Sequence, residues 1–411
     1  MHRESLKPVP FEPYTAEFAA NPYPVYAELR QRSPVFQSNA LGMTLLTRYR
    51  DIFRALTDRR LGRAEPAPGG ATPGNLCSAT TKAGELPAYD RFVRINLLET
   101  EGETHGRLRR LLSLALSPRR IAGLKARVQH IAGELVDRLA AGREVDFIGE
   151  IAEPLPVIVI SGLLGWPAGE RHRLRPWSAD IVRLYEKDAT RHDAGRAEAA
   201  CKEFAAMLDA LATERKASPQ NDLISALAAL EDDPGGLTRD ELISSCMLLL
   251  NAGHEATVNA AGNGLLALLR HPDEMGKLRN EPALMDTAIE EMLRYDAPLH
   301  LFHRFACEEI VIEGQVIPRG GKIGLLYGSA NRDPDSFPEP DRFDIARSPN
   351  RHLAFGAATH FCLGAPLARL ELRTLFGSLL ARTKFIELCG NEPEYHRGLV
   401  FRGLKRLTIR T

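Results

Sequence analysis

The fold of this 411-residue chain is decided near its C-terminus by the stretch Phe355-Gly356-Ala357-Ala358-Thr359-His360-Phe361-Cys362-Leu363-Gly364. Residues 365–372 continue in a helical pattern, so Cys362 stands just before the N-terminus of a predicted helix. Backbone N–H groups and the positive end of the helix dipole stabilise a thiolate there and lower the pKa of the cysteine. Such a thiolate is a strong axial ligand for haem iron. The alternative is that Cys362 is a buried small hydrophobic residue, as most free cysteines are.

The spacing of this stretch resembles the haem-binding loop of the cytochrome P-450 monooxygenases, which reads Phe-Gly-x-Gly-x-His-x-Cys-x-Gly. The matching positions are Phe355, Gly356, His360, Cys362 and Gly364. The resemblance implies that Cys362 ligates the iron and that the other matching residues form the haem-binding loop. Ala358 departs from the pattern, since the family usually has a glycine there. If this position requires a left-handed conformation, alanine costs about 1 kcal/mol.

The resemblance extends over nearly the whole chain and implies a single cytochrome P-450 domain over residues 1–411. Its fold class is expected to be mainly α with small β-sheets, with haem b (iron protoporphyrin IX) between a long central helix and the cysteine loop. A large core is possible because 44% of the residues are hydrophobic. Short apolar alternations around Phe36 and at residues 43–46 predict two of the strands.

Charge and cysteine content restrict the partners and the compartment. The formal net charge is +0, so a general affinity for nucleic acid or for an anionic membrane has no electrostatic support. The six cysteines lack paired spacing and follow no signal peptide, which favours a reducing cytoplasm. The most apolar run, residues 155–166, is shorter than the roughly 18 residues that suggest a membrane span. We therefore expect a soluble cytoplasmic protein. We also expect it to be a monomer.

A second motif lies in the longest predicted helix. Thr238 and Glu241 fit a capping box, and the apolar pattern then continues to the break at His271, about 50 Å further along a helix axis. Within this helix, Ala252-Gly253-His254-Glu255 resembles the oxygen-activation motif of the family.

The resemblance assigns roles within that motif. Ala252 and Gly253 would leave room for O2 beside the iron, and Glu255 would help to deliver protons. Ala256 replaces the alcohol that normally follows the acid, and Thr257 is rotated by about 100° around the helix, so we do not expect it to substitute. The alternative for Glu255 is a structural carboxylate bonded to the backbone.

Burying the two haem propionates requires cationic hydrogen-bond donors. His105 and Arg109 lie on one face of a predicted helix and match the family's His-x-x-x-Arg pattern, while Arg304 matches its propionate-binding arginine. The alternative is a solvated basic face, which would suit the neighbouring Arg107, Arg110, Arg119 and Arg120. Those arginines could equally dock an acidic electron donor.

The pair Glu291-x-x-Arg294 is weak as a motif, because charged residues three apart are common on helix surfaces. In the family such a pair locks onto a meander before the haem loop, and residues 330–343 resemble that meander. We interpret Glu291 and Arg294 as a structural lock without a part in the chemistry.

The substrate pocket has no motif and is predicted from the resemblance alone. Its lining is expected to include Leu248, Asn251, Ala252, Leu299, His300, Leu399 and Val400. A strand is predicted at residues 298–304, where His300 and His303 could equally be ordinary strand histidines. Two amphipathic helices within residues 167–215 would form the roof, and the Pro- and Gly-rich residues 62–95 would form a mobile lid or be disordered.

These features predict a haem-thiolate monooxygenase that inserts one atom of O2 into a small or medium organic substrate. Electrons from NAD(P)H would arrive through separate proteins, either a ferredoxin with its ferredoxin reductase or a flavodoxin, because no flavin or ferredoxin region is recognisable. Oxidative coupling or peroxide-driven chemistry on the same haem is an alternative that Ala256 encourages. A haem-binding sensor without turnover is a further alternative, which would not need Glu255 in a formed pocket.

Overall fold

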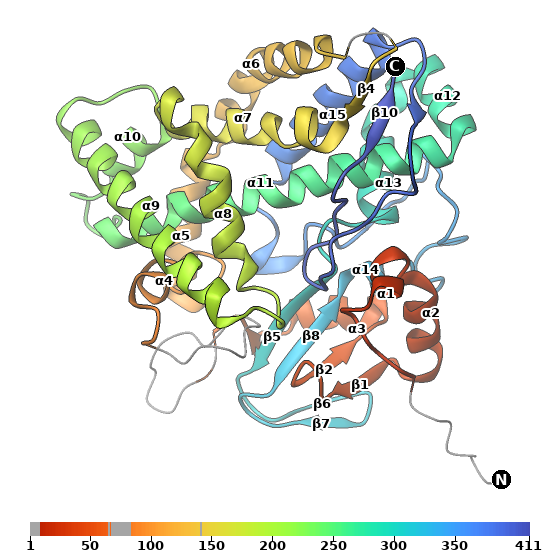
Figure 1. Ribbon diagram of the computed structural model, residues 1–411. Coiled ribbons are helices and arrows are strands. Elements are labelled where there is room, and N and C mark those ends of the chain that lie inside the picture. The colour runs from red at the N-terminus through yellow and green to blue at the C-terminus, as the bar shows by residue number, and fades with distance from the viewer. Residues whose placement is uncertain (1–8, 65, 67–83, 140–141) are drawn as a thin grey trace.

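The computed structural model describes residues 9–64, 66, 84–139 and 142–411. Its longest helix, α11 (Arg239–Arg270), crosses the centre of the molecule in Figure 1. Thr238 caps α11 through its side chain and Glu241 completes the capping box, which confirms the predicted start. His271 ends the helix at the predicted break. Buried residues occur all around α11, as expected of a helix in the core of a large protein.

Helices form most of the described structure. Those before α11 are α1 (Ala16–Ala20), α2 (Tyr23–Arg32), α3 (Tyr49–Thr57), α4 (Pro87–Phe92), α5 (Gly102–Ala115), α6 (Pro118–Asp137), α7 (Pro154–Leu164), α8 (Leu174–Arg183), α9 (Arg191–Ala217) and α10 (Leu223–Ala228). Those after it are α12 (Pro272–Asn280), α13 (Met285–Tyr295), α14 (Tyr327–Ala330) and α15 (Ala365–Arg382). Shorter helical turns are η1 (Ile148–Ala152), η2 (Ala168–Arg173), η3 (Pro282–Leu284) and η4 (Ala358–His360).

The helices cover α11 on several sides. Helices α7, α8, α9, α13 and α15 all contact it, and α15 also packs along α6. The pair α8 and α9 confirms the two helices predicted within residues 167–215, with the connection at residues 184–190. Because α15 begins directly after Gly364, the cysteine loop is anchored to the same helical core as α11.

The strands are β1 (Val35–Ser38), β2 (Met43–Leu46), β3 (Leu61–Gly62), β4 (Glu144–Asp146), β5 (Leu301–Ala306), β6 (Ile310–Ile312), β7 (Gln315–Ile317), β8 (Lys322–Leu326), β9 (Glu387–Leu388) and β10 (Thr408–Arg410). They form a five-stranded sheet in the order β1-β2-β8-β5-β3, a three-stranded sheet β4-β10-β9, and the hairpin β6-β7. The predicted strands near Phe36 and at residues 43–46 are confirmed as β1 and β2. The strand predicted at residues 298–304 is displaced, because β5 begins only at Leu301 and Leu299 makes an isolated bridge with Phe401.

The predicted lock between Glu291 and Arg294 is present and fully buried. Two hydrogen bonds of 2.7 and 2.8 Å join the side chains. The Arg294 guanidinium also donates to the carbonyls of Asn331, Pro340 and Arg342. This network fixes α13 to the meander that leads into the cysteine loop.

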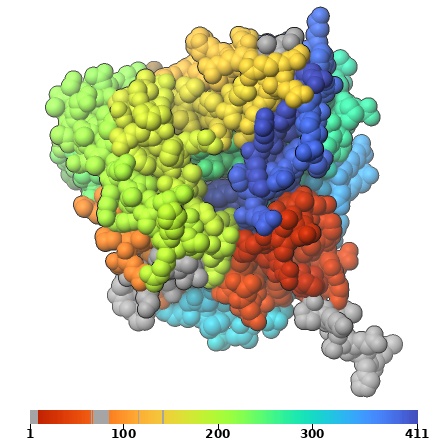
Figure 2. All heavy atoms as spheres, in the orientation of Figure 1, coloured from red at the N-terminus to blue at the C-terminus, as the bar shows by residue number. Residues whose placement is uncertain are grey.

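The two ends of the described chain meet in a buried polar network. Asp296 accepts hydrogen bonds from Tyr23, Tyr395 and Arg402, at 2.5, 2.9 and 2.6 Å. Figure 2 shows the C-terminal residues (dark blue) against the N-terminal region (red). The network ties the sheet region to the end of α13, just before the segment predicted to face the haem.

Part of the predicted lid, residues 67–83, lies outside the described residues. The remainder of that segment contains α4, so this part of the predicted lid is helical. Pro87 occupies the first turn of α4, where its fixed φ favours a helix start. Among the residues that the structure describes, no helix combines the length and the apolar character needed to cross a bilayer.

Candidate active site

The cysteine loop is held by its own backbone. Cys362 N donates to Phe355 O at 2.9 Å, and Gly356 N donates to Leu353 O at 2.9 Å. Gly356 and Ala358 have φ values of +67° and +56°. Ala358 therefore adopts the left-handed conformation for which a glycine would be favourable, at a cost of about 1 kcal/mol. These bonds close the loop so that Cys362 directly precedes α15.

The electrostatic surroundings of Cys362 are mixed. The amides of Gly364 and Ala365 interact with the thiol, and the positive charges of Arg109 and Arg369 also favour a thiolate. Burial outweighs them and raises the pKa of Cys362, so the expected lowering is wrong for the protein alone. A bound cation reverses this balance, because a metal-coordinated thiol is deprotonated.

Histidines and a glutamate lie together beside the loop. The rings of His105 and His360 are 4.3 Å apart, and His360 Nε2 lies 2.9 Å from Glu101 Oε1. His105 is buried, and its Nε2 has no hydrogen-bond partner among the residues that the structure describes. Burial, followed by the charge of His360, lowers the pKa of His105 to about 4. Glu101 was not predicted, because its partner lies 259 residues away.

Three arginines approach the same region. Arg109 Nη2 donates to Phe361 O at 2.8 Å, which attaches α5 to the cysteine loop. Arg304 is buried in β5 and donates to His303 O at 3.0 Å. Arg63, which the sequence did not single out, is also buried and donates to the same His303 carbonyl at 2.9 Å. The predicted set His105, Arg109 and Arg304 is thus assembled around the loop, with Arg63 beside it.

The middle of α11 is more exposed than the parts of the helix on either side of it. Ala252 is exposed and Gly253 is half-buried, whereas the helix is almost continuously buried over residues 257–268. A Cβ added at Gly253 would meet no atom within 4 Å. Small residues at the open position of a buried helix leave space beside it. The helix can therefore border a flat cofactor and a small gas molecule.

Glu255 lies in a polar cluster on the same helix. Burial, and then the charge of Glu153, raise the pKa of Glu255, while Arg175 opposes the rise. Arg175 donates to Glu153 at 2.5 Å. The ring of His254 is buried and lies 3.6 Å from Glu255. Glu153 and Arg175 were not predicted, because Glu153, just before α7, and Arg175, in α8, approach α11 only in the folded chain.

Ala256 and Thr257 differ as their helical positions predict. Ala256 is half-buried, whereas Thr257 is buried. Their environments therefore differ, in line with the rotation of about 100° between adjacent helical residues.

The predicted pocket residues are only partly brought together. Leu299 lies opposite Phe401, and the amides of Leu399 and Val400 donate to the buried carboxylate of Glu186. Glu186 lies in the α8–α9 connection and joins the roof to the C-terminal turn. It was not predicted from the sequence. On α11, Leu248 and Asn251 are buried, and Asn251 Oδ1 has no hydrogen-bond partner within the described part of the chain.

His300, which the sequence predicts in the pocket, is buried against the N-terminal region. Its Nδ1 lies 3.1 Å from Tyr26 Oη, and a Cβ at Gly328 would meet its ring at 2.6 Å. Its ring also contacts Tyr23. The ring therefore packs against α2 in the N-terminal region.

The predicted basic face is smaller than expected. Arg107 donates to Gly236 O and to Glu241. Its side chain is therefore bound to the start of α11 and is not part of the basic face. Arg110, Arg119 and Arg120 are exposed. Leu114 and Phe361 add exposed apolar area, at 63% and 39%.

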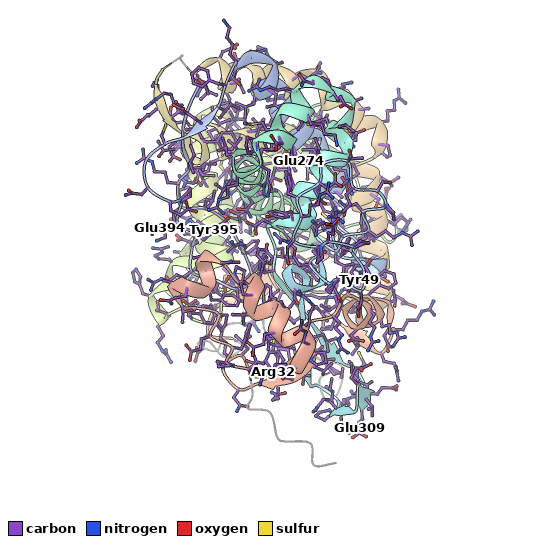
Figure 3. All side chains as sticks on the ribbon, turned by 90° about the vertical axis from the view of Figure 1, so that its right-hand side faces the viewer. Arg32, Tyr49, Glu274, Glu309, Glu394 and Tyr395 are labelled. Carbon is purple, nitrogen blue, oxygen red and sulfur yellow. The ribbon has the colours of Figure 1, made fainter. Side chains whose placement is uncertain are left out.

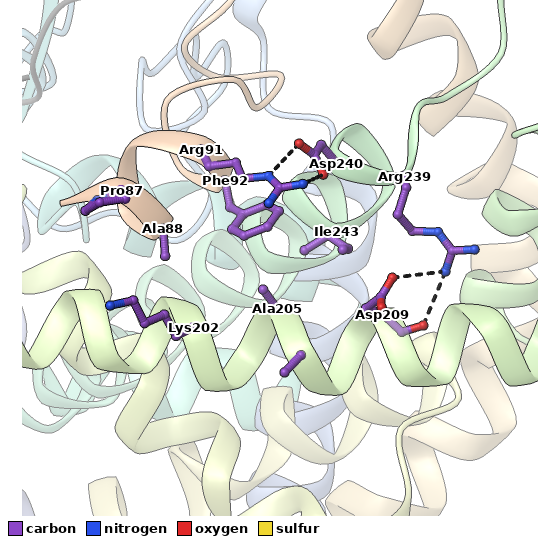
Figure 4. Close-up of a pocket in the computed structure, with 11 residues that line it drawn as sticks. Pro87, Ala88, Arg91, Phe92, Lys202, Ala205, Asp209, Arg239, Asp240 and Ile243 are labelled. Atoms are coloured by element: carbon purple, nitrogen blue, oxygen red, sulfur yellow. Dashed lines mark hydrogen bonds and ion pairs between the residues drawn. The ribbon is translucent and has the colours of Figure 1, made fainter. Parts of the chain in front are cut away.

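An outer groove of about 460 Å³ lies between α4, α9 and the start of α11 (Figure 4). Its apolar floor includes Phe92 and Ile243. On its rim, Arg91 is paired with Asp240, and Arg239 with Asp209. None of the predicted site residues lines this groove, so we place the chemistry elsewhere, at the cysteine loop and the open part of α11.

The described residues fit a haem. Cys362 offers a sulfur ligand, His105 Nε2 is a buried polar atom without a partner among the described residues, and Arg304 is a buried cation. A buried group without a partner is costly, and a propionate would satisfy the histidine and the arginine together.

Comparison with known proteins agrees with this geometry. The family model described as Cytochrome P450 matches residues 179–402. The polyketide biosynthesis cytochrome P450 PksS of Bacillus subtilis is 36% identical over 408 residues, which cover 97% of this chain and 98% of that protein. The 6-deoxyerythronolide B hydroxylase of Saccharopolyspora erythraea is 37% identical, over 94% of this chain and 95% of that protein. The structure of P450BioI with a fatty-acid-ligated acyl carrier protein has a TM-score of 0.89 at 33% identity, covering 97% and 100%.

Proposed function

The chain belongs to the cytochrome P450 family, and we propose that the Cys362 loop and the open middle of α11 are the two walls of its haem site. The protein is a haem-thiolate monooxygenase that uses O2 and acts on a small or medium organic molecule. Bound haem b supplies the oxidising chemistry, with electrons from NAD(P)H delivered through redox partners.

The proposal assigns the haem contacts to particular atoms. Cys362 Sγ is the iron ligand, and the amides of Gly364 and Ala365 moderate its negative charge. His105, Arg109 and Arg304 hold the propionates, while Phe355, His360 and Gly364 shape the loop. The observation that carries this assignment is the closed loop, in which Cys362 N donates to Phe355 O at 2.9 Å and the cysteine stands just before α15.

On the distal side we assign proton delivery to Glu255. Burial and Glu153 raise the pKa of its carboxyl, so it holds a proton more readily than an exposed acid and is suited to general acid catalysis. Arg175, paired with Glu153, keeps the cluster close to neutral. Gly253 and Ala252 leave the space that O2 requires.

The finer properties of the protein are part of the same proposal. We propose a ferredoxin with its reductase, or a flavodoxin, as the electron source, docking where Arg110, Arg119 and Arg120 are exposed beside the cysteine loop. We further propose one catalytic domain over residues 1–411, which is monomeric and cytoplasmic. The described cysteines are free, as expected in a reducing compartment.

The test is the visible spectrum of the purified protein. Reduction under carbon monoxide should give the long-wavelength Soret band of a thiolate-ligated haem, and a reconstituted ferredoxin system should consume NAD(P)H and O2 when substrate is added. A reduced carbon monoxide complex with the spectrum of a histidine-ligated haem would contradict the assignment of Cys362.

Ala256 favours a second candidate reaction, oxidative coupling or peroxide-driven oxidation on the same haem. An enzyme of that kind would form its product with hydrogen peroxide in the absence of any redox partner. Product formation that strictly requires the partner proteins and O2 would exclude it.

A further inference from the structure

An ion pair behind the cysteine loop joins α15 to α13, two helices that pack against each other. Arg369, in α15, donates from Nε and Nη2 to the two carboxylate oxygens of Glu290, in α13, and both distances are 2.7 Å. His352 Nε2 lies 3.1 Å from Glu290 Oε2. Two parallel hydrogen bonds to one carboxylate fix the guanidinium in orientation as well as in position.

The fixed guanidinium lies on a residue of the cysteine loop. Arg369 Cζ is 4.5 Å from the centroid of the Phe355 ring, and Phe355 O accepts the hydrogen bond from Cys362 N at 2.9 Å. Arg369 follows the first residue of α15 by about one turn, and helical side chains lean towards the N-terminus, which here adjoins the cysteine. A positive charge therefore stands against the segment that carries the sulfur ligand. In agreement, burial raises the pKa of Cys362, and Arg369 is among the charges that oppose the rise.

The charges of the pair do not change over the working pH range. Although burial opposes the change, hydrogen bonds with Arg369 and His352 lower the pKa of Glu290 to about 2. An arginine keeps its proton in proteins. The side chains of Arg369 and Glu290 are 25% and 24% exposed, so salt screens their charges only in part. The loop therefore meets a constant charge distribution, with the cation on Phe355.

We propose that Arg369, fixed on Phe355 by Glu290, raises the reduction potential of the haem bound at Cys362. This inference rests on the proposed function, because it requires a haem at the loop. One-electron reduction from ferric to ferrous haem, with the electron supplied by the redox partner, adds a negative charge beside Cys362. A nearby cation stabilises that charge. Arg369 is a positioning residue and not a catalytic one, since its contact is with Phe355.

The test is the reduction potential of the ferric–ferrous couple, measured on the purified holoenzyme by spectroelectrochemical titration. Arg369→Gln removes the positive charge and leaves Glu290 anionic, so the potential should become more negative. Glu290→Gln removes the negative charge and leaves the cation, so the potential should become more positive. A unit charge roughly 10 Å away, at an effective dielectric constant of about 20, changes such an equilibrium about tenfold. For one electron this is a shift of about 59 mV.

Opposite signs distinguish this role from a purely structural one. An ion pair that only joined α13 to α15 would lose stability in either variant and would not shift the potential in opposite directions. Arg369→Lys keeps the charge and should restore most of the potential, although an ammonium group cannot make the two parallel bonds. The double variant with glutamine at both positions carries neither charge, so its potential should lie between those of the single variants.

A matched control pair lies one turn further along the same two helices. Arg373, one turn after Arg369, pairs at 2.7 Å with Asp286, one turn before Glu290. Both pairs line one surface depression of about 370 Å³. The side chains of the control pair are 43% and 68% exposed, so salt screens their charges more strongly. Arg373→Gln should therefore shift the potential much less than Arg369→Gln does.

Three results would overturn the proposal. They are an unchanged potential in Arg369→Gln, shifts of the same sign in Arg369→Gln and Glu290→Gln, and a shift in Arg373→Gln as large as that in Arg369→Gln. If Arg369→Gln does not fold, Glu290→Gln decides, and a potential that does not become more positive would contradict the proposal. The haem content and the carbon monoxide spectrum are recorded for every protein, so a failure of Cys362 to hold the haem is seen separately from a failure of this role.

Discussion

The two sides of the haem site are built in different ways. On the side of Cys362, one contiguous loop is closed by its own backbone, and buried Arg294 donates to three carbonyls of the adjacent meander. On the side of α11, the polar groups come from segments far apart in the chain, and Asn251 Oδ1 has no hydrogen-bond partner among the described residues. The difference indicates a division of labour. The backbone that carries Cys362 is fixed by hydrogen bonds within the protein, whereas side chains that would meet a ligand, such as His105 beside the loop and Asn251 on α11, keep an atom without a partner among the described residues.

The largest effect is expected at Cys362, on the first side. Cys362→His exchanges the thiolate for an imidazole, so the long-wavelength band of the reduced carbon monoxide complex should disappear together with monooxygenase activity. The measurement is the carbon monoxide difference spectrum of the purified variant. Cys389→Ser is the control and should keep the band. If Cys362→His retained the band, the loop would not hold the iron, and the proposed difference between the two sides would be contradicted.

A smaller effect is expected on the second side, at Glu255. Glu255→Gln keeps the shape of the side chain but removes the acid, so product formation should slow by about 10²–10⁴. The haem content and the carbon monoxide spectrum should not change, because the residue does not hold the cofactor. Glu309→Gln, at an exposed position labelled in Figure 3, is the control. Normal product formation in Glu255→Gln would show that protons arrive by another route.

The lock behind the cysteine loop should affect stability rather than rate per haem. Arg294→Ala leaves Glu291 buried and removes the donor to three carbonyls, so we expect a loss of about 3–5 kcal/mol in the free energy of unfolding. Arg342→Ala is a matched control, since Arg342 pairs with Glu339 at the same i,i+3 spacing on the surface. An exposed pair contributes about 0–1 kcal/mol. Denaturant unfolding measures both, and equal losses would contradict the structural role of the lock.

The sequence predicted an interaction well where its partners are close together in the chain, and poorly where they are far apart. The cysteine loop, the start of α11 and the Glu291–Arg294 pair depend on neighbours within a few residues, and the structure contains all three. Glu101, Arg63 and Glu153 were not predicted, because their partners lie outside any local sequence pattern. Arg63 and His303, for example, are 240 residues apart. The contact of His300 with Tyr26 was likewise not predicted, because the two residues are 274 positions apart in the chain. Local patterns thus predicted the side that holds the cofactor better than the side that selects the substrate.

The basic patch beside the cysteine loop should have a modest effect on electron transfer. Arg110→Glu should slow reduction by an acidic ferredoxin a few-fold, and the difference from the wild type should shrink as salt is added, because exposed charges are screened. Arg32→Glu, on α2, is the control on another part of the surface. The measurement is the reduction rate in stopped flow at several ionic strengths. A rate that depends on neither Arg110 nor salt would place the docking surface elsewhere.

The smallest change is expected from Ala256→Thr with the native substrate. An alcohol at this position normally helps to deliver the second proton, and alanine cannot donate it. Thr257 is buried while Ala256 is half-buried, so the neighbouring alcohol does not take its place. Either a water held by Glu255 or a hydroxyl of the substrate must act instead.

The two donors make different demands on the substrate. If the substrate supplies the proton, it carries a polar group close to the oxidised carbon, and a deoxy analogue should be poorly coupled, because losing one positioned donor costs about 10²–10⁴ in rate. Ala256→Thr should then rescue the deoxy analogue and hardly change the native substrate. The measurement is product formed per NAD(P)H consumed, for both proteins and both substrates. Equal coupling of the two substrates in the wild type would reject proton delivery by the substrate. The remaining donor would then be a water held by Glu255, so the α11 side would supply its own proton donor.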